Sequence, residues 1–180
     1  MSRFLSNNKS NIIVADSVED VRKHIVGLLK NDYNVIDTCD GEEVVNLLHE
    51  ESDLIDLLII GSEIDKIDGF ELLEIINRND WIKNFPVVMI AKNNNNNELD
   101  RAFDLGATDF IAPPFYKNTV LKRVANSIAL FKEKKRIINI VEGEVFKREK
   151  NNNKLIEFLG HIVEFRNGDN GMHIFHMQAM

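Results

Sequence analysis

The chain has 180 residues, of which 44% are apolar and 28% charged, and its formal net charge is −7. This composition supplies enough apolar side chains for a buried core and excludes a wholly disordered chain. No apolar stretch is long enough to span a bilayer, and the amino terminus lacks the apolar segment of a secretion signal. A single cysteine cannot form an intramolecular disulfide and indicates a reducing, cytoplasmic location. The negative charge argues against nucleic-acid binding by the chain as a whole.

Runs of asparagine punctuate the sequence at residues 7–8, 93–97 and 151–153. Asparagine is poor in both helices and strands, so each run predicts a loop or a boundary. We therefore expect a loop in the region of 93–97. At 151–153 we expect a break in any helix that reaches this point.

Short apolar segments alternate with segments of helical periodicity over the first two thirds of the chain. The apolar segments predict strands at residues 11–15, 33–38, 54–60, 86–91 and 108–112. The segments between them have apolar side chains at helical spacing and predict helices at residues 18–30, 42–51, 70–77 and 99–105. Because the strands are apolar throughout, we expect a parallel sheet covered on both faces, in a doubly wound α/β sandwich.

The pattern changes to helix alone after residue 115. One helical face completes the α/β domain with Val120, Val124, Ile128 and Phe131. A second apolar stripe then follows at Ile137, Ile138, Val141 and Val145, and Gly143 interrupts its helical pattern. We divide the chain into an α/β domain over 11–131, a helical linker over 132–154 and an amphipathic segment over 155–180.

Ligands of open α/β sheets bind at the carboxyl ends of the strands, which directs attention to the residues that follow each predicted strand. The motifs there are DGF at 68–70, LGATDFI at 105–111 and PF at 114–115. Their order and spacing resemble a response-regulator receiver domain over about residues 11–131. The resemblance implies a flavodoxin-like (βα)5 sheet with strand order 2-1-3-4-5, in a protein of two-component phosphorelay signalling.

Receivers of this family carry an acidic pair, a phosphoaccepting aspartate, a hydroxyl residue and a lysine after strands one, three, four and five. The matching positions are Ala15 and Asp16, Gly61, Ala91 and Pro113. Only Asp16 keeps the required chemistry, because Gly61 has no nucleophile, and Ala91 and Pro113 supply neither hydroxyl nor cation. One carboxylate is a poor Mg²⁺ site. The resemblance therefore implies a pseudo-receiver without enzymatic activity and without a cofactor.

Three smaller expectations concern the same domain. Asp16 precedes the first predicted helix, and Glu19 follows three residues later, a spacing typical of a capping box. The resemblance implies that Phe110 is the switch aromatic residue of the family. It also implies a cis peptide bond between Pro113 and Pro114.

A second resemblance covers about residues 155–180 and is carried by the segment 162–173, IVEFRNGDNGMH. This segment is similar to the opening helix of HD-type (HD-GYP) phosphohydrolases, which hydrolyse cyclic dinucleotides at a metal centre. Asp169 and His173 match two of the metal-ligand positions and would share one helix face. The chain ends before the His-Asp pair that names the family, so we expect a transition metal only where a complete HD domain is present. Alternatively, His173 and His176 are ordinary polar residues of an amphipathic tail.

Two functional hypotheses follow from these patterns. In the first, the chain is a signalling module that acts by homodimerisation or by contact with a partner protein. Its linker helix extends past Phe131, and the apolar stripe of this helix pairs with a second copy of the chain. In the second, it is the regulatory front end of an HD-type phosphodiesterase. A nucleotide or flavin binder would need a phosphate loop where residues 16–20 are acidic. A DNA-binding regulator would need a further helix-turn-helix.

Overall fold

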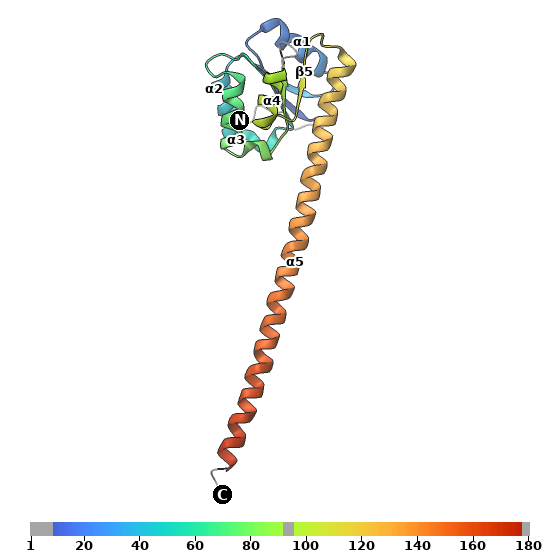
Figure 1. The fold of residues 1–180 in the computed structure, drawn as a ribbon. Helices are drawn as coiled ribbons and strands as arrows, with labels where there is room; N and C mark the ends of the chain where they lie inside the picture. The colour runs from blue at the N-terminus through green and yellow to red at the C-terminus, as the bar shows by residue number, and fades with distance from the viewer. Residues whose placement is uncertain (1–8, 92–95, 178–180) are drawn as a thin grey trace. The chain divides into compact units, whose positions relative to one another are not determined.

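The structure, a computed structural model, describes residues 9–91 and 96–177, with side chains as far as residue 159. Its centre is a parallel sheet of five strands in the order β2-β1-β3-β4-β5 (Figure 1). The strands are β1 Asn11–Ala15, β2 Asn34–Thr38, β3 Leu57–Gly61, β4 Val87–Ile90 and β5 Asp109–Ile111. The predicted fold class and strand order are confirmed.

The predicted third strand is shorter than its apolar run. Residues 52–54 form a short 3-10 turn, η1 Ser52–Leu54, and the Leu54 side chain is 48% exposed. The strand begins at Leu57. Just before it, the Asp56 carboxylate accepts a hydrogen bond from the backbone amide of Asn11. All five residues of β3 are buried, because helices cover both faces of the sheet.

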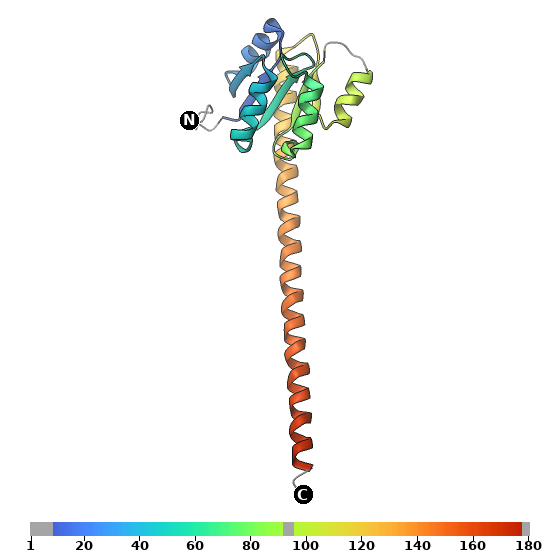
Figure 2. The same cartoon turned by 90° about the vertical axis from the view of Figure 1, so that its left-hand side faces the viewer.

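The helices form two layers, one on each face of the sheet (Figure 2). They are α1 Glu19–Leu29, α2 Gly41–Glu51, α3 Gly69–Arg78, α4 Asn96–Asp104 and α5 Lys117–Met177, with a second 3-10 turn, η2 Trp81–Lys83. One core cluster joins the sheet to α2, α3 and α4. The other joins the opposite face to α1 and the first turns of α5, where Val120 and Val124 are buried.

Two backbone features lie in the loops on either side of β5. Gly106 has φ of +101°, a left-handed conformation that favours glycine. The peptide bond between Pro113 and Pro114 is cis, as the sequence predicts.

The chain divides into two compact units, one that ends at Lys132 and one that begins at Glu133. Within the first unit, the Lys132 ammonium contacts the Asp56 carboxylate at 2.6 Å and ties this turn of α5 to the amino end of the sheet. In the second unit, every described side chain, over residues 133–159, is exposed.

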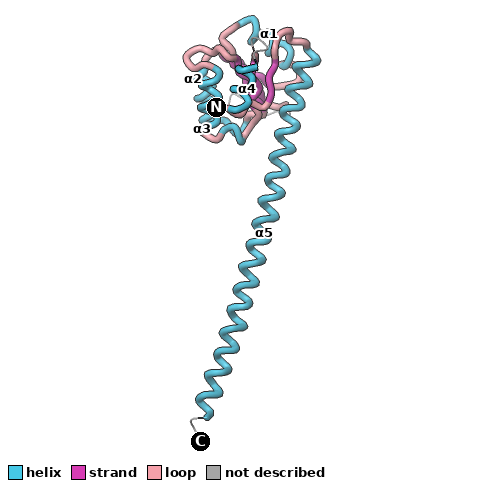
Figure 3. The backbone as a smooth tube through the Cα atoms, viewed as in Figure 1, coloured by secondary structure: helices cyan, strands magenta, loops and turns pink. Residues whose placement is uncertain are grey.

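Helix α5 continues through Gly143 and through residues 151–153 (Figure 3). The predicted break at the third asparagine run is therefore wrong. The cost of asparagine in a helix is roughly 0.7 kcal/mol per residue and that of glycine about 1 kcal/mol. The lysine, glutamate, arginine and leucine residues around them are good helix formers, and the helix tolerates these costs. Asp169 and His173 lie in the part of α5 whose side chains are outside the described set.

None of the helices, over the residues that the structure describes, combines the length and apolar character needed to cross a bilayer.

Candidate functional site

The carboxyl ends of the parallel strands bring the predicted site positions to one edge of the sheet. Ala15 pairs with Ile60 across β1 and β3, and Gly61 pairs with Ile90 across β3 and β4. The residues that follow β1, β3 and β4 are thus neighbours in space, although they are far apart in the sequence. This is the edge at which open α/β sheets bind ligands.

The central feature of this edge is the approach of Asp16 to Gly61. A Cβ atom built on Gly61 would lie 2.7 Å from the Asp16 Cγ atom and closer still to Oδ2. The Asp16 side chain is nearly buried, at 5% exposure. Its carboxylate therefore occupies the space in which a side chain at position 61 would begin.

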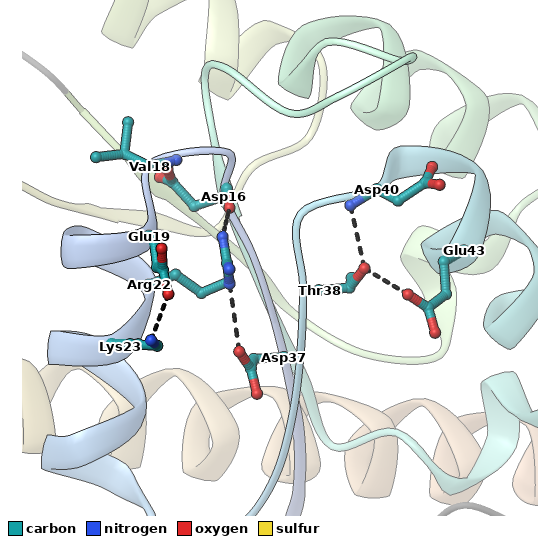
Figure 4. A network of polar contacts seen from close by, with 9 residues as sticks. All are labelled: Asp16, Val18, Glu19, Arg22, Lys23, Asp37, Thr38, Asp40 and Glu43. Carbon is teal, nitrogen blue, oxygen red and sulfur yellow. Dashed lines mark hydrogen bonds and ion pairs between the residues drawn. The ribbon is translucent and has the colours of Figure 1, made fainter.

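Backbone hydrogen bonds hold Asp16 in this position (Figure 4). The Val18 amide donates to Asp16 Oδ1 at 2.7 Å, and the Asp16 amide donates to the Thr38 carbonyl at 3.2 Å. The Arg22 guanidinium donates to the Asp16 carbonyl at 2.6 Å and to the Asp37 carboxylate at 3.2 Å. The carboxylate is fixed by the turn that precedes α1.

The expected capping box at the start of α1 is absent. The N-cap residue is Val18, which makes no side-chain cap bond, and Asp16 bonds the Val18 amide instead of an amide inside the helix. Glu19 forms an ion pair with Lys23, one turn along the helix. The pKa of Glu19 is lowered by its hydrogen bond to this ammonium. The spacing of Asp16 and Glu19 fits a capping box, but the N-cap of the helix is Val18, two residues after Asp16.

The two positions that the resemblance assigns to the acidic pair are Ala15, at the end of β1, and Asp16. Ala15 is fully buried in the core cluster that joins the sheet to α2 and α3, and it carries no carboxylate. Next to the pair, the Ser17 amide and hydroxyl both donate to the Glu63 carbonyl, at 2.9 and 3.0 Å.

The oxygen atoms at this edge do not fit Mg²⁺. An octahedral ion needs one or two carboxylates and further oxygen ligands. Asp16 supplies one carboxylate, Gly61 supplies none, and the Glu63 carbonyl already accepts two hydrogen bonds. No three metal-ligating side chains gather anywhere in the described part of the chain.

Ala91 and Pro113 lie where the resemblance places a hydroxyl and an ammonium group. Ala91 is 8% exposed, and its amide donates to the Ile111 carbonyl at 2.9 Å, which extends the sheet by one residue. Pro113 is exposed and carries neither a donor nor a charge. These two positions can orient no phosphoryl oxygen.

Phe110 lies beside an aromatic and cationic group on the surface formed by α4, β5 and the first turns of α5. Its ring meets the Phe103 ring edge-on at 6.1 Å, and the Arg123 guanidinium lies 5.4 Å from its centroid. Arg123 also contacts the Asp109 carboxylate at 2.6 Å. The adjoining hollow of about 520 Å³ is lined in part by Phe110, Pro113, Tyr116 and Arg123.

A second polar network, which the sequence did not predict, ties the loop after β3 to the start of α2. Lys66, in a left-handed conformation with φ of 67°, contacts the carboxylates of Asp40 at 2.5 Å and Glu42 at 2.8 Å. The hydrogen bond from Lys66 lowers the pKa of Asp40, and the two carboxylates raise the pKa of Lys66. Nearby, the Thr38 hydroxyl donates to Glu43 at 2.6 Å (Figure 4).

Comparisons with known proteins agree with the fold described above. Residues 12–125 match the family model of the response regulator receiver domain. The chain is 34% identical over 116 residues to "Response regulator RR06" of Streptococcus pneumoniae, a match that covers 63% of this chain and 51% of that one. It is 26% identical over 117 residues to "Two-component response regulator-like APRR5" of Arabidopsis thaliana, covering 64% of this chain and 21% of that one.

The solved structures show the same fold. The signal receiver domain of a putative Luxo repressor protein from Vibrio parahaemolyticus superposes with a TM-score of 0.64 at 17% identity. That superposition covers 72% of this chain and 97% of the receiver. The matched region thus corresponds to one whole domain of that kind.

Proposed function

This chain belongs to the response regulator receiver domain family of two-component systems, and from that premise we propose that its receiver signals without being phosphorylated. No enzyme domain is evident in the described residues. The observation that carries the proposal is the Asp16 carboxylate in the space where an acceptor side chain at position 61 would begin. The proposed receiver is a protein-binding module whose phosphorylation site is closed.

The remaining residues at the sheet edge support this proposal. Phosphoryl transfer is catalysed mostly by positioning and by electrostatic stabilisation of the transferred group. Loss of one such donor typically costs about a hundredfold to a thousandfold in rate. Here Ala15, Ala91 and Pro113 offer neither a second carboxylate, nor a hydroxyl at the fourth strand, nor a cation. Asp16 is a poor replacement for the acceptor, because its carboxylate accepts a hydrogen bond from the Val18 amide, and Ala91 and Pro113 supply no hydroxyl or cation to hold a phosphoryl oxygen.

The output of such a module runs through protein contacts. The first turns of α5 pack on the sheet through Val120, Val124 and Ile128, so this helix experiences any change in the packing of the domain. Helix α5 then continues as the described part of the second unit. We propose that dimerisation or partner binding through α5 carries the signal.

The test is incubation with acetyl phosphate and Mg²⁺, followed by intact mass measurement. We expect no mass change for the unmodified chain or for Gly61→Asp alone. The matched positive control rebuilds the family pattern with Gly61→Asp, Ala15→Asp, Ala91→Thr and Pro113→Lys together, and it should gain one phosphate. One phosphate on the unmodified chain, mapped to the residues after β1 or β3, would overturn the proposal.

The second hypothesis, a regulatory front end of an HD-type phosphodiesterase, is not supported by any described side chain. It depends on Asp169 and His173, whose side chains lie outside the described residues. The cytoplasmic location also stays a prediction.

A further inference from the structure

The second unit exposes large apolar side chains over most of its described length. Each is between 44% and 67% exposed; they are Ile137, Ile138, Ile140, Val141, Val145, Phe146, Leu155, Ile156, Phe158 and Leu159. Isolated amphipathic helices gain most of their stability from packing of the apolar face. Contiguous exposed apolar surface on this scale marks a protein contact.

These side chains follow a heptad repeat. Steps of three and four residues connect the seam positions Ile138, Val141, Val145, Arg148, Asn152, Leu155 and Leu159. Ile137, Ile156 and Phe158 lie directly beside this seam at the flanking heptad positions, and only Ile140 and Phe146 lie away from it. The apolar surface is thus concentrated on one side of the helix.

We propose that this seam pairs with the same seam of a second copy of the chain, in a parallel and in-register coiled coil. The proposal rests on the proposed role of α5 as the output element, but it does not depend on the phosphorylation state of the receiver. The partner is a second copy of this chain, and the contact joins Ile138, Val145 and Asn152 to the same residues of that copy.

The exposed area is sufficient for such a pair. Eight of the ten exposed apolar residues lie on the seam or beside it. Each offers on the order of 100 Å², so together they offer ~800 Å² per helix, about the area that each partner buries in a stable complex. The same stripe on a second copy therefore offers enough apolar area to cover this one.

The residue types favour a parallel pair of helices. Ile138 and Val145 are β-branched residues at the first core position of the heptad, which favours two strands. Asn152 occupies the same core position, and a single asparagine there fixes the register because the two amides can bond one another. Arg148 is the unfavourable layer. Its aliphatic stem can be buried while its charge stays in water, near Glu149 at the adjacent heptad position.

Sedimentation of the full chain tests self-association. We expect a particle of twice the 20.7 kDa chain mass at micromolar concentration. Val145→Lys, on the seam, should shift the protein to monomer and weaken association at least tenfold. Ile140→Lys is the matched control, because residue 140 has similar exposure, 53% against 49%, but lies off the seam. Leu159→Lys, a second seam variant in another heptad, should behave like Val145→Lys, and circular dichroism would verify that each variant is folded.

Cysteine cross-linking tests the orientation. In a Cys39→Ser background, Asn152→Cys should form a disulfide-linked dimer under copper-phenanthroline oxidation, whereas Ile140→Cys should not. A monomeric chain, or equal losses from Val145→Lys and Ile140→Lys, would overturn the proposal. Cross-linking between Val145→Cys and Leu155→Cys chains without cross-linking of Asn152→Cys would overturn the parallel arrangement. None of these measurements uses a phosphodonor, so they fail or succeed independently of the phosphorylation test.

Discussion

The two units of this chain handle their apolar residues in opposite ways. In the first unit, β1, β3 and β4 are almost wholly buried between two helical layers. In the second unit, isoleucine, valine, leucine and phenylalanine side chains are about half exposed or more over residues 137–159. Helices of the first unit cover its apolar side chains, whereas the described apolar side chains of the second unit, over residues 137–159, are exposed.

This difference separates stability from assembly. The first unit can be folded and stable as a single copy, because its core is closed by its own helices. The described apolar side chains of the second unit, over residues 137–159, can gain burial by packing against another molecule. Substitutions in the first unit should therefore change the free energy of unfolding, and substitutions in the second should change association.

The largest expected effect is in the core of the first unit. Ile59, in the central strand, is fully buried, and Ile59→Ala should lower the free energy of unfolding by about 2–5 kcal/mol. Ile140→Ala, at a 53% exposed position of the second unit, should change it by about 0.5 kcal/mol or less. Urea denaturation followed by circular dichroism would measure both. Equal effects would mean that the second unit shares the core of the first.

The next effect concerns the close approach of two glycines at the site. A Cβ on Gly69 would lie 2.9 Å from the Gly61 carbonyl carbon and closer still to its oxygen. Gly69→Ala must displace α3 from the end of β3, at a cost of about 1–3 kcal/mol. Gly27→Ala is the control, since a Cβ there meets nothing within 4 Å, and it should stabilise the chain by roughly 0.5–1 kcal/mol. Destabilisation by both would contradict the steric explanation.

Most of the fold could be predicted because its signals are local. Buried parallel strands leave continuous apolar runs, and the five runs gave the five strands of the sheet. The start of β3 was missed because Leu54 is apolar but belongs to a turn. The continuity of α5 was missed because the small helix penalties of residues 151–153 were taken as a stop signal, although their neighbours favour the helix.

The site could be predicted only as a set of positions. The sequence locates Gly61, Ala91 and Pro113 at the ends of their strands, but it contains no signal for the turn of Asp16 into the space beside Gly61. That geometry arises from the bond between Asp16 and the Val18 amide, which depends on the path of the chain before α1. The Lys66 network was missed for the same reason, because Lys66 and Asp40 are distant in the sequence.

The contact between Asp16 and residue 61 predicts a coupling. Gly61→Ala introduces the Cβ that would clash with the Asp16 carboxylate, and it should lower the free energy of unfolding by about 1–2 kcal/mol as the carboxylate leaves the Val18 amide. In an Asp16→Ala background the same substitution should cost much less. A double-mutant cycle measured by urea denaturation gives the coupling. Equal costs in the two backgrounds would show that Asp16 does not fill this space.

The smallest effect returns to the second unit and asks whether its helix is stabilised independently of the receiver. A Cβ on Gly143 meets nothing within 4 Å, and residue 143 lies on the outer side of the helix, opposite the seam. Gly143→Ala should therefore favour the helix by up to about 1 kcal/mol through its higher helix propensity, without changing any packed contact. Because helix formation and pairing of the seam are coupled and both chains carry the substitution, the dimer should become up to about thirtyfold tighter in sedimentation, while the urea midpoint of the receiver unit stays the same. A shift of the receiver midpoint instead would show that the two units unfold as one.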